Sequence, residues 1–227
     1  MSADSSTGGD MQFAVRLAMD AGDLEAAARL RYEVLVEEMG KSYPRADAQR
    51  RLLADPLDPH ADVLLAEDAT GTVVGTIRSY AFGTRQDWTV HDSEYALREF
   101  AHLPRAVLGT CTHLAVHRLH RRFLVRDLLF RALYSLQLER GVRLCFTSCP
   151  RILVRLFEHY GFREYAATVQ DELLGPVQRL VLALDDLAHL RRVQSPFLEI
   201  AQSRDVEPAV RPWLEDLVAT RVPGART

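Results

Sequence analysis

The fold of this chain is decided by residues 108–129, which read LGTCTHLAVHRLHRRFLVRDLL. Residues 108–116 have the character of a central β-strand, and residues 125–140 have that of a strongly apolar helix. Backbone N–H groups at the start of such a helix bind phosphate, because they lack partners within the helix and lie at the positive end of its dipole. The turn between the two elements adds Arg118, Arg121, Arg122 and Arg126. We therefore predict an anion site; the alternative is a solvated basic turn.

The composition of the chain is that of an ordinary globular protein. Its 227 residues are 48% hydrophobic and 26% charged, with a formal net charge of −3. Domains usually have roughly 100–200 residues, so we expect one domain with appendages. The near-neutral charge argues against a general nucleic-acid binder. Residues 1–10 lack the apolar core of a secretory signal and no long apolar run occurs, so we expect a disordered start, no membrane span and a cytoplasmic protein.

The cysteines give no sign of a disulfide framework or a metal centre. Cys111, Cys145 and Cys149 are an odd set, and no pair of histidines lies near them at the spacing of metal ligands. Small buried side chains are the more common role of such residues. We therefore expect no metal and no cysteine nucleophile.

Strands and helices alternate through the rest of the chain. Period-2 alternation predicts a strand at residues 13–19, and helical spacing predicts a helix at 24–38 with Asp23 as its N-cap. Residues 41–59 are polar and rich in proline, which indicates an irregular crossing segment with a short helix at 46–53. Further strands are expected at 63–67, 73–82, 144–148, 163–171 and 178–184, and further helices at 93–100, 152–160, 186–193 and 210–220. This order predicts a mixed α/β domain.

The order of elements and the basic turn together resemble the GCN5-related N-acyltransferase (GNAT) fold. The likeness spans about residues 13–184 and is most specific at 121–126 (RRFLVR) and at 156–162 (LFEHYGF). Within that fold the chain is more similar to N-acyl amino acid synthases and acylhomoserine lactone synthases, on the residues RYEVLVEEMG (31–40), Asp55, Asp58, GTIR (75–78) and THLAV (112–116). The resemblance implies a GNAT domain over 11–185, with splayed central strands flanked by helices, and a C-terminal helical extension over 186–227 docked on it.

The resemblance also implies the activity and the donor. It implies an N-acyltransferase that moves a long fatty acyl group from a phosphopantetheine thioester to the amino group of an amino acid, a peptide or a related amine. The residues expected to hold the donor are Leu114, Ala115, Val116, Arg121, Arg122, Phe123, Leu124, Val125 and Arg126. Leu124 and Arg126 stand where the family loop has glycine, which crowds a CoA pyrophosphate. An acyl carrier protein presents one phosphate on an acidic surface, so we expect acyl carrier protein as the preferred donor, with acyl-CoA possible.

Four residues are candidates for deprotonating the acceptor amine. Related enzymes often carry Glu on the central strand, where this chain has Thr110 and Thr112. A threonine hydroxyl does not accept a proton at neutral pH, so the threonines would need an ordered water, or else Glu99 or His113 would act. Strand alternation predicts His113 on the face opposite the two threonines. A packed strand histidine and a surface glutamate are the plainer alternatives.

The acceptor pocket and the acyl tunnel complete the expected site. The resemblance assigns Arg31, Asp55, Asp58 and Arg78 to the acceptor pocket; by their chemistry they could equally form an ion network that closes the fold. Phe82, Phe146 and Phe157 would line an acyl tunnel or simply belong to the core. Two further functions stay open: an acetyltransferase that uses acetyl-CoA, and a silent module that binds an acyl ligand or a carrier protein.

Overall fold

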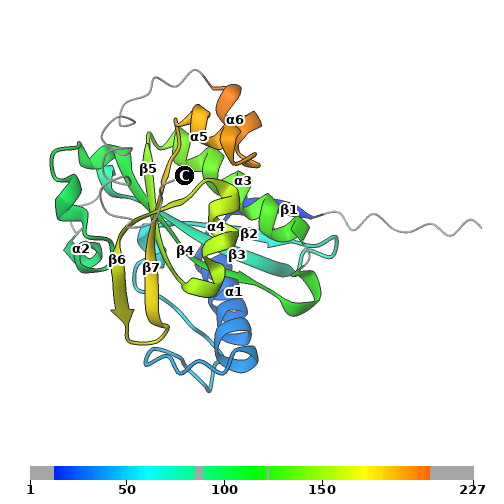
Figure 1. The fold of residues 1–227 in the computed structure, drawn as a ribbon. Helices are drawn as coiled ribbons and strands as arrows, with labels where there is room; N and C mark the ends of the chain where they lie inside the picture. The colour runs from blue at the N-terminus through cyan, green and yellow to red at the C-terminus, as the bar shows by residue number, and fades with distance from the viewer. Residues whose placement is uncertain (1–12, 85–88, 122, 205–227) are drawn as a thin grey trace, which may run out of the picture.

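The computed structural model describes residues 13–84, 89–121 and 123–204. Its centre is a seven-stranded sheet in the order β1-β2-β3-β4-β5-β7-β6 (Figure 1). Neighbouring strands are antiparallel except for β4 and β5, which are parallel. The predicted mixed α/β sheet is therefore confirmed. The strands are β1 (Ala14–Leu17), β2 (Asp62–Glu67), β3 (Val73–Ala81), β4 (Leu108–Val116), β5 (Leu144–Pro150), β6 (Arg163–Asp171) and β7 (Gly175–Ala183).

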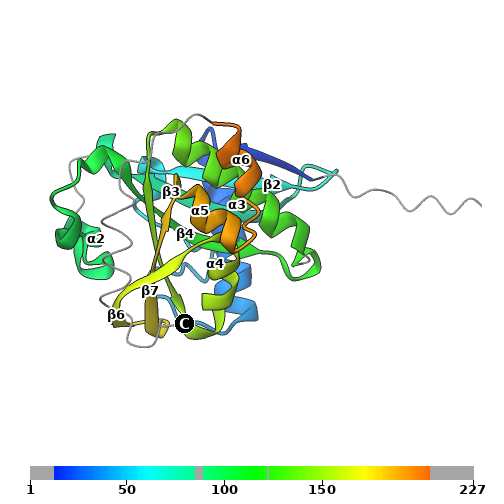
Figure 2. The same ribbon diagram turned by 45° about the horizontal axis from the view of Figure 1, so that its top comes forward.

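Helices cover both faces of the sheet (Figures 1 and 2). One face carries α3 (Phe123–Glu139), α4 (Val154–Tyr160), α5 (Leu187–Arg192) and α6 (Leu198–Gln202), which share one large apolar core with the strands. The other face carries α1 (Ala21–Arg31), whose Ala27 packs on β2, and α2 (Thr89–Tyr95), whose Tyr95 packs with Phe146. Short 3₁₀ turns connect these elements: η2 (Asp58–His60), η3 (Phe82–Thr84), η4 (Leu97–Phe100), η5 (Arg105–Val107), η6 (Arg118–His120) and η7 (Arg151–Leu153).

The two parallel strands separate part of the way along their length. Strand pairing joins Leu108–Thr110 of β4 to residues 144–146 of β5, and it goes no further. Beyond Thr110, β4 pairs only with β3, and beyond Phe146, β5 pairs only with β7. We call the opening between residues 111–116 of β4 and residues 147–150 of β5 the β4–β5 fork. The expected splayed central strands are therefore present.

A β-bulge at His113 sets the direction of the side chains along one edge of the fork. The register between β3 and β4 shifts from Arg78↔Thr112 to Thr76↔Ala115, so β4 contains one extra residue, and His113 has a φ of 56°. Beyond the bulge, Ala115 packs with residues of α1 and η1, whereas Leu114 packs toward the α3 core. The prediction from simple alternation, which placed His113 opposite Thr110 and Thr112, was wrong because a bulge interrupts the alternation.

Several predicted boundaries also differ from the structure. The helix at 24–38 begins earlier, because Asp20 and not Asp23 is its N-cap, and it continues as a π-helix, η1 (Tyr32–Glu38). The short helix at 46–53 was wrong, since this segment is a turn closed by a bridge between Asp47 and Leu52. The helix at 93–100 is divided by Ala96, which has a φ of 49°. The strand at 13–19 is shortened to β1. The expected helix at 210–220 and the start at 1–10 lie outside the described residues.

The predicted arginines and aspartates converge on a buried ion network. Arg31 NH1 lies 2.5 Å from Asp58 Oδ2, and Arg78 NH1 lies 3.2 Å from Asp58 Oδ1 and 2.9 Å from Asp55 Oδ1. Arg31 is 0% exposed, Asp58 5% and Arg78 3%. Two positive and two negative charges balance each other, which reduces the cost of burying them. The network ties the crossing segment to α1 and β3.

We expect Asp58→Asn to destabilise the fold strongly. The substitution removes the carboxylate that both buried guanidinium groups share, and breaking a buried pair costs about 3–5 kcal/mol. Urea unfolding measures this loss. Glu25→Gln is the control, because Glu25 pairs with Arg29 and Arg50 on the exposed surface, where such pairs contribute about 0–1 kcal/mol. Similar losses for the two variants would contradict a closing role for Asp58.

Candidate active site

The β4 side of the fork carries Thr112 and His113, both held by the ion network. Arg78 Nε donates to Thr112 Oγ1 at 3.1 Å, and His113 Nε2 lies 3.4 Å from Asp55 Oδ2. Asp55 and His113 are 20% and 26% exposed at their side chains, whereas Arg31 and Asp58 are buried behind them. The accessible edge of the network is therefore the Asp55–His113 pair.

Electrostatics keep His113 neutral and Asp55 charged. Burial lowers the pKa of His113, and the nearby charges of Arg78 and Arg31 lower it further, against the opposing effect of Asp55. Burial acts to raise the pKa of Asp55, but hydrogen bonding to His113 and the charge of Arg78 outweigh it and hold that pKa far below its ordinary value. A neutral imidazole beside a carboxylate donates through Nε2–H, which leaves the lone pair on Nδ1. Nδ1 is buried and has no hydrogen-bond partner among the described residues. The lone pair on Nδ1 is thus the proton-accepting position of this pair, and an amine reaches it only when the atoms that enclose it move aside.

The other two predicted catalytic candidates lie elsewhere. Thr110 is 1% exposed and is the last residue of β4 that pairs with β5. Glu99 lies in η4 near Tyr165 of β6: burial raises the pKa of Tyr165, and the charge of Glu99 contributes to this rise. The charge of Glu94 contributes to the same rise, so this effect alone does not separate Glu99 from the residues near the fork.

The sequence prediction missed Ser148 and Glu94, which lie on the β5 side of the fork. Ser148 Oγ donates to Glu94 Oε1 at 2.7 Å. The guanidinium of Arg179, on β7, donates to the backbone carbonyls of Ser93 and Glu94, each at 2.6 Å, and so holds the end of α2 on the sheet. The spacing of the sequence does not show which of Glu94 and Glu99 contributes to the site. Only the strand register, which places Ser148 in the fork, selects Glu94.

The basic turn is partly neutralised by acids that are distant in sequence. Arg121 Nε donates to the Val116 carbonyl at 3.1 Å, and its NH2 group pairs with Glu38 of η1. His117 Nε2 lies 3.0 Å from Glu33 Oε1. A π-helix brings residues five apart onto one side, and Glu33 and Glu38 therefore face the turn together.

The remaining donor residues are placed as follows. Arg118 is exposed and Arg126 partly buried, whereas Arg122 lies outside the described residues. Phe123 is the first residue of α3, Leu124 is 49% exposed and Val125 is 1% exposed.

Glu33, Glu38 and His117 have oxygen and nitrogen atoms within 4.8 Å of one another, as a metal site would need. The guanidinium of Arg121 already pairs with Glu38 in this group.

The three phenylalanines do not line one common space. Phe82 and Phe146 belong to the core under α2, whereas Phe157 belongs to the core under α3 and α4. The expected single tunnel lined by all three was therefore wrong, because the sheet lies between them.

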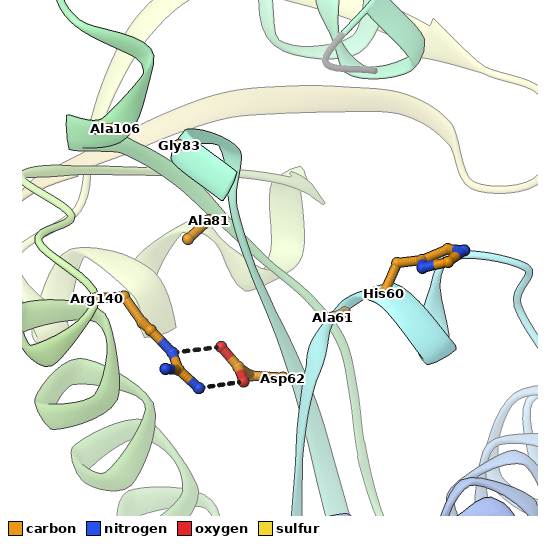
Figure 3. A pocket seen from close by; sticks show the side chains of 7 residues that line it. All are labelled: His60, Ala61, Asp62, Ala81, Gly83, Ala106 and Arg140. Carbon is orange, nitrogen blue, oxygen red and sulfur yellow. Dashed lines mark hydrogen bonds and ion pairs between the residues drawn. The ribbon is translucent and has the colours of Figure 1, made fainter. Parts of the chain in front are cut away.

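A pocket of about 410 Å³ does lie near the start of β4, where Ala81 pairs with Gly109 (Figure 3). Its polar side is the ion pair between Arg140 and Asp62, with atoms 2.9 Å apart.

The cysteines are unsuited to nucleophilic catalysis. Cys111, Cys145 and Cys149 are all free and buried. Burial raises the pKa of Cys149 to about 12 and that of Cys145 well above its ordinary value. A thiol held in the protonated form is a poor nucleophile.

Comparison with known proteins gives one domain match and one short sequence match. A family model for the acetyltransferase (GNAT) domain matches residues 30–131. The L-ornithine N(alpha)-acyltransferase of Rhodobacter capsulatus is 47% identical over 60 residues, a match that covers 26% of this chain and 23% of that enzyme. No described helix is long and apolar enough to cross a membrane.

Two solved structures are similar in fold. FeeM, an N-acyl amino acid synthase from uncultured soil microbes, has a TM-score of 0.63 at 19% identity, and the match covers 86% of this chain and 99% of FeeM. BjaI, a CoA-dependent acyl-homoserine lactone synthase, has a TM-score of 0.58 at 18% identity, and the match covers 80% of this chain and 92% of BjaI. Both enzymes are named for acyl transfer. This chain therefore has the GNAT fold, and the residues that the domain model matches include the ion network, the basic turn and the β4 side of the fork.

Proposed function

We propose that the protein is a cytoplasmic N-acyltransferase that moves a fatty acyl group from a phosphopantetheine thioester to the amino group of an amino acid or a related amine. The observation that carries this proposal is the His113–Asp55 pair at the edge of the β4–β5 fork. A neutral imidazole oriented by a carboxylate is suited to deprotonating an amine. The acyl-transfer activities for which the similar proteins are named agree with it.

The fork supplies a place for the donor. Residues 111–116 of β4 have no strand partner on the side of β5. Backbone N–H and C=O groups need hydrogen-bond partners, and the amide groups of a pantetheine arm provide them. The N–H of Leu114 polarises the thioester carbonyl, while the start of α3 and Arg118 bind the phosphate.

The reaction is a direct transfer. The free amine attacks the thioester carbonyl, an amide bond forms and the carbon–sulfur bond breaks. His113 accepts the proton that the amine loses, and the departing thiolate of the donor takes up a proton. The buried thiols described above offer no nucleophile for a covalent enzyme intermediate.

An acidic acyl carrier protein fits the surface beside the fork better than a free CoA. Leu119 is 71% exposed and Leu124 49%, and Arg118 lies beside them. The turn after β5 is similar: Ile152 is 87% exposed, and Arg155, three residues further along the chain, is also exposed. Because β4 and β5 are parallel, the turns that follow them lie at the C-terminal ends of neighbouring strands, on the same side of the molecule. Exposed apolar residues with arginines match a partner whose surface is acidic.

We expect the purified protein to form an amide from a long-chain acyl carrier protein and an amino acid. Mass spectrometry detects the amide product, and parallel reactions with acyl-CoA and acetyl-CoA compare the donors. Activity with acetyl-CoA alone would replace the proposal by an acetyltransferase. Binding of the donor without any amide would instead indicate a silent binding module.

We expect His113→Gln to lower kcat/KM about 10²- to 10⁴-fold, the usual contribution of a general base. The pKa of His113 is lowered, so the wild-type rate should be present at neutral pH and fall only as the pH drops below the ordinary histidine range. The variant should lack this acid limb. His60→Gln, at an exposed histidine outside the fork, should behave as wild type. An unchanged pH profile in His113→Gln would exclude His113 as the base.

We expect Arg118→Glu and Arg155→Glu to raise KM for acyl carrier protein on the order of tenfold, since a charge at the rim of an interface steers the partner. Acyl-phosphopantetheine keeps the phosphate but lacks the carrier protein, so it should show no such change for Arg155→Glu, whereas Arg118→Glu should affect it through the phosphate. Arg191→Glu, at an exposed arginine of α5, is the control. Equal effects of Arg155→Glu on both donors, measured by steady-state kinetics at low and high salt, would argue against docking at these turns.

A further inference from the structure

Glu94 is a carboxylate at the β5 side of the fork to which the described residues offer no cationic partner. Its side chain is half-buried, and among the described residues its carboxylate accepts a hydrogen bond only from Ser148. The nearby Arg179 donates to backbone carbonyls at the end of α2 and not to this carboxylate. A partly buried carboxylate is more stable with a cation beside it.

The acids on the opposite side of the fork are already neutralised. Asp58 pairs with Arg31 and Arg78, and Asp55 pairs with Arg78 and His113. Glu38, at the turn, pairs with Arg121. Glu33, also at the turn, lies against His117. Among the described acids around the fork, Glu94 is therefore the one whose charge a ligand can balance.

A second polar group lies buried beside Glu94. The side chain of Tyr95 is 0% exposed, and its hydroxyl forms no well-directed hydrogen bond among the described residues, although Glu94 and Ser148 lie close enough to influence its pKa through hydrogen bonding. Burial and the charge of Glu94 raise the pKa of Tyr95 well above its ordinary value, so the hydroxyl stays protonated. A buried hydroxyl without a partner costs free energy that a ligand group can recover.

Strand register places these groups opposite His113. Thr110 pairs with Phe146, so Thr112 and Ser148, each two residues further along parallel strands, lie at the same level on the same face. His113 adjoins Thr112, and Glu94 is bound to Ser148. An acceptor whose reacting amine meets His113 can therefore extend its other end across the fork toward Glu94.

We propose that Glu94, Ser148 and Tyr95 form a subsite for a second, positively charged group of the acceptor. The preferred acceptors are then amino acids with a cationic side chain, and the diamino acids fit best because an ammonium donates to both the carboxylate and the hydroxyls. This inference rests on the proposed N-acyltransferase function. Glu94 selects the acceptor and takes no part in the proton transfer.

The test compares L-ornithine with L-norvaline, which has the same carbon chain without the terminal amine. With one long-chain acyl thioester as donor, the wild-type protein should prefer ornithine. Glu94→Gln should lower kcat/KM for ornithine about 10- to 100-fold, mainly through KM, because a hydrogen bond to a charged group is lost. Its kcat/KM for norvaline should stay within about threefold of wild type.

Two further variants keep the test decisive if Glu94→Gln folds poorly. Tyr95→Phe removes a hydroxyl that forms no well-directed hydrogen bond among the described residues, so its thermal stability should change little, while KM for ornithine should rise several-fold. Ser148→Ala keeps the carboxylate but removes the group that holds it, and it should have the same selective effect. Glu25→Gln, on exposed α1, is the matched control for a lost glutamate charge.

The outcomes separate this inference from the function beneath it. An equal loss with ornithine and norvaline in Glu94→Gln would overturn the subsite, since it would show a role in proton transfer or in the fold. Equal use of the two acceptors by the wild type would overturn the subsite and leave the transferase activity standing. Absence of any amide from the wild type would overturn both.

Discussion

The shared carboxylate of Asp58 is the interaction on which the rest of the structure depends. Two guanidinium groups, those of Arg31 and Arg78, lie in the interior, and neither can remain charged there without a counter-ion. Asp58 provides one only if the crossing segment passes directly over β3. That path brings Asp55 against His113, at the bulge of β4. The requirement for charge balance in the core thus positions the groups at the accessible edge.

The fork depends on a second constraint, the backbone of β4. A parallel pair of strands would normally continue to pair along its length, but β4 bends at the bulge and remains with β3. The backbone groups on its other edge then need partners from outside the sheet. The left-handed conformation of His113 is unfavourable for a residue with a side chain, and such strain is retained where the surrounding structure enforces it. Here hydrogen bonds to Thr112 and Asp55 fix the residues around the bulge.

The sequence predicted the architecture well, because strands and helices leave periodic patterns. The central strand, the turn and α3 were predicted close to their observed positions, and the resemblance indicated the grouping of Arg31, Asp55, Asp58 and Arg78. Three features had no local signal. The bulge depends on pairing with β3, so alternation alone gave the wrong face for His113. The ion pair of Arg121 depends on a π-helix far away in sequence. The choice of Glu94 over Glu99 depends on which one reaches β5.

The charges on the two sides of the fork differ in a way that suits an amine acceptor. On the β4 side the network is neutral, with two arginines balanced by two aspartates and a neutral imidazole. On the β5 side Glu94 is negative, and the described residues offer it no cation. The field across the fork therefore draws a positive group toward β5 and leaves the uncharged form of an amine favoured beside His113. A single acceptor that carries two amines satisfies both sides, with one amine held as an ammonium and the other free to attack.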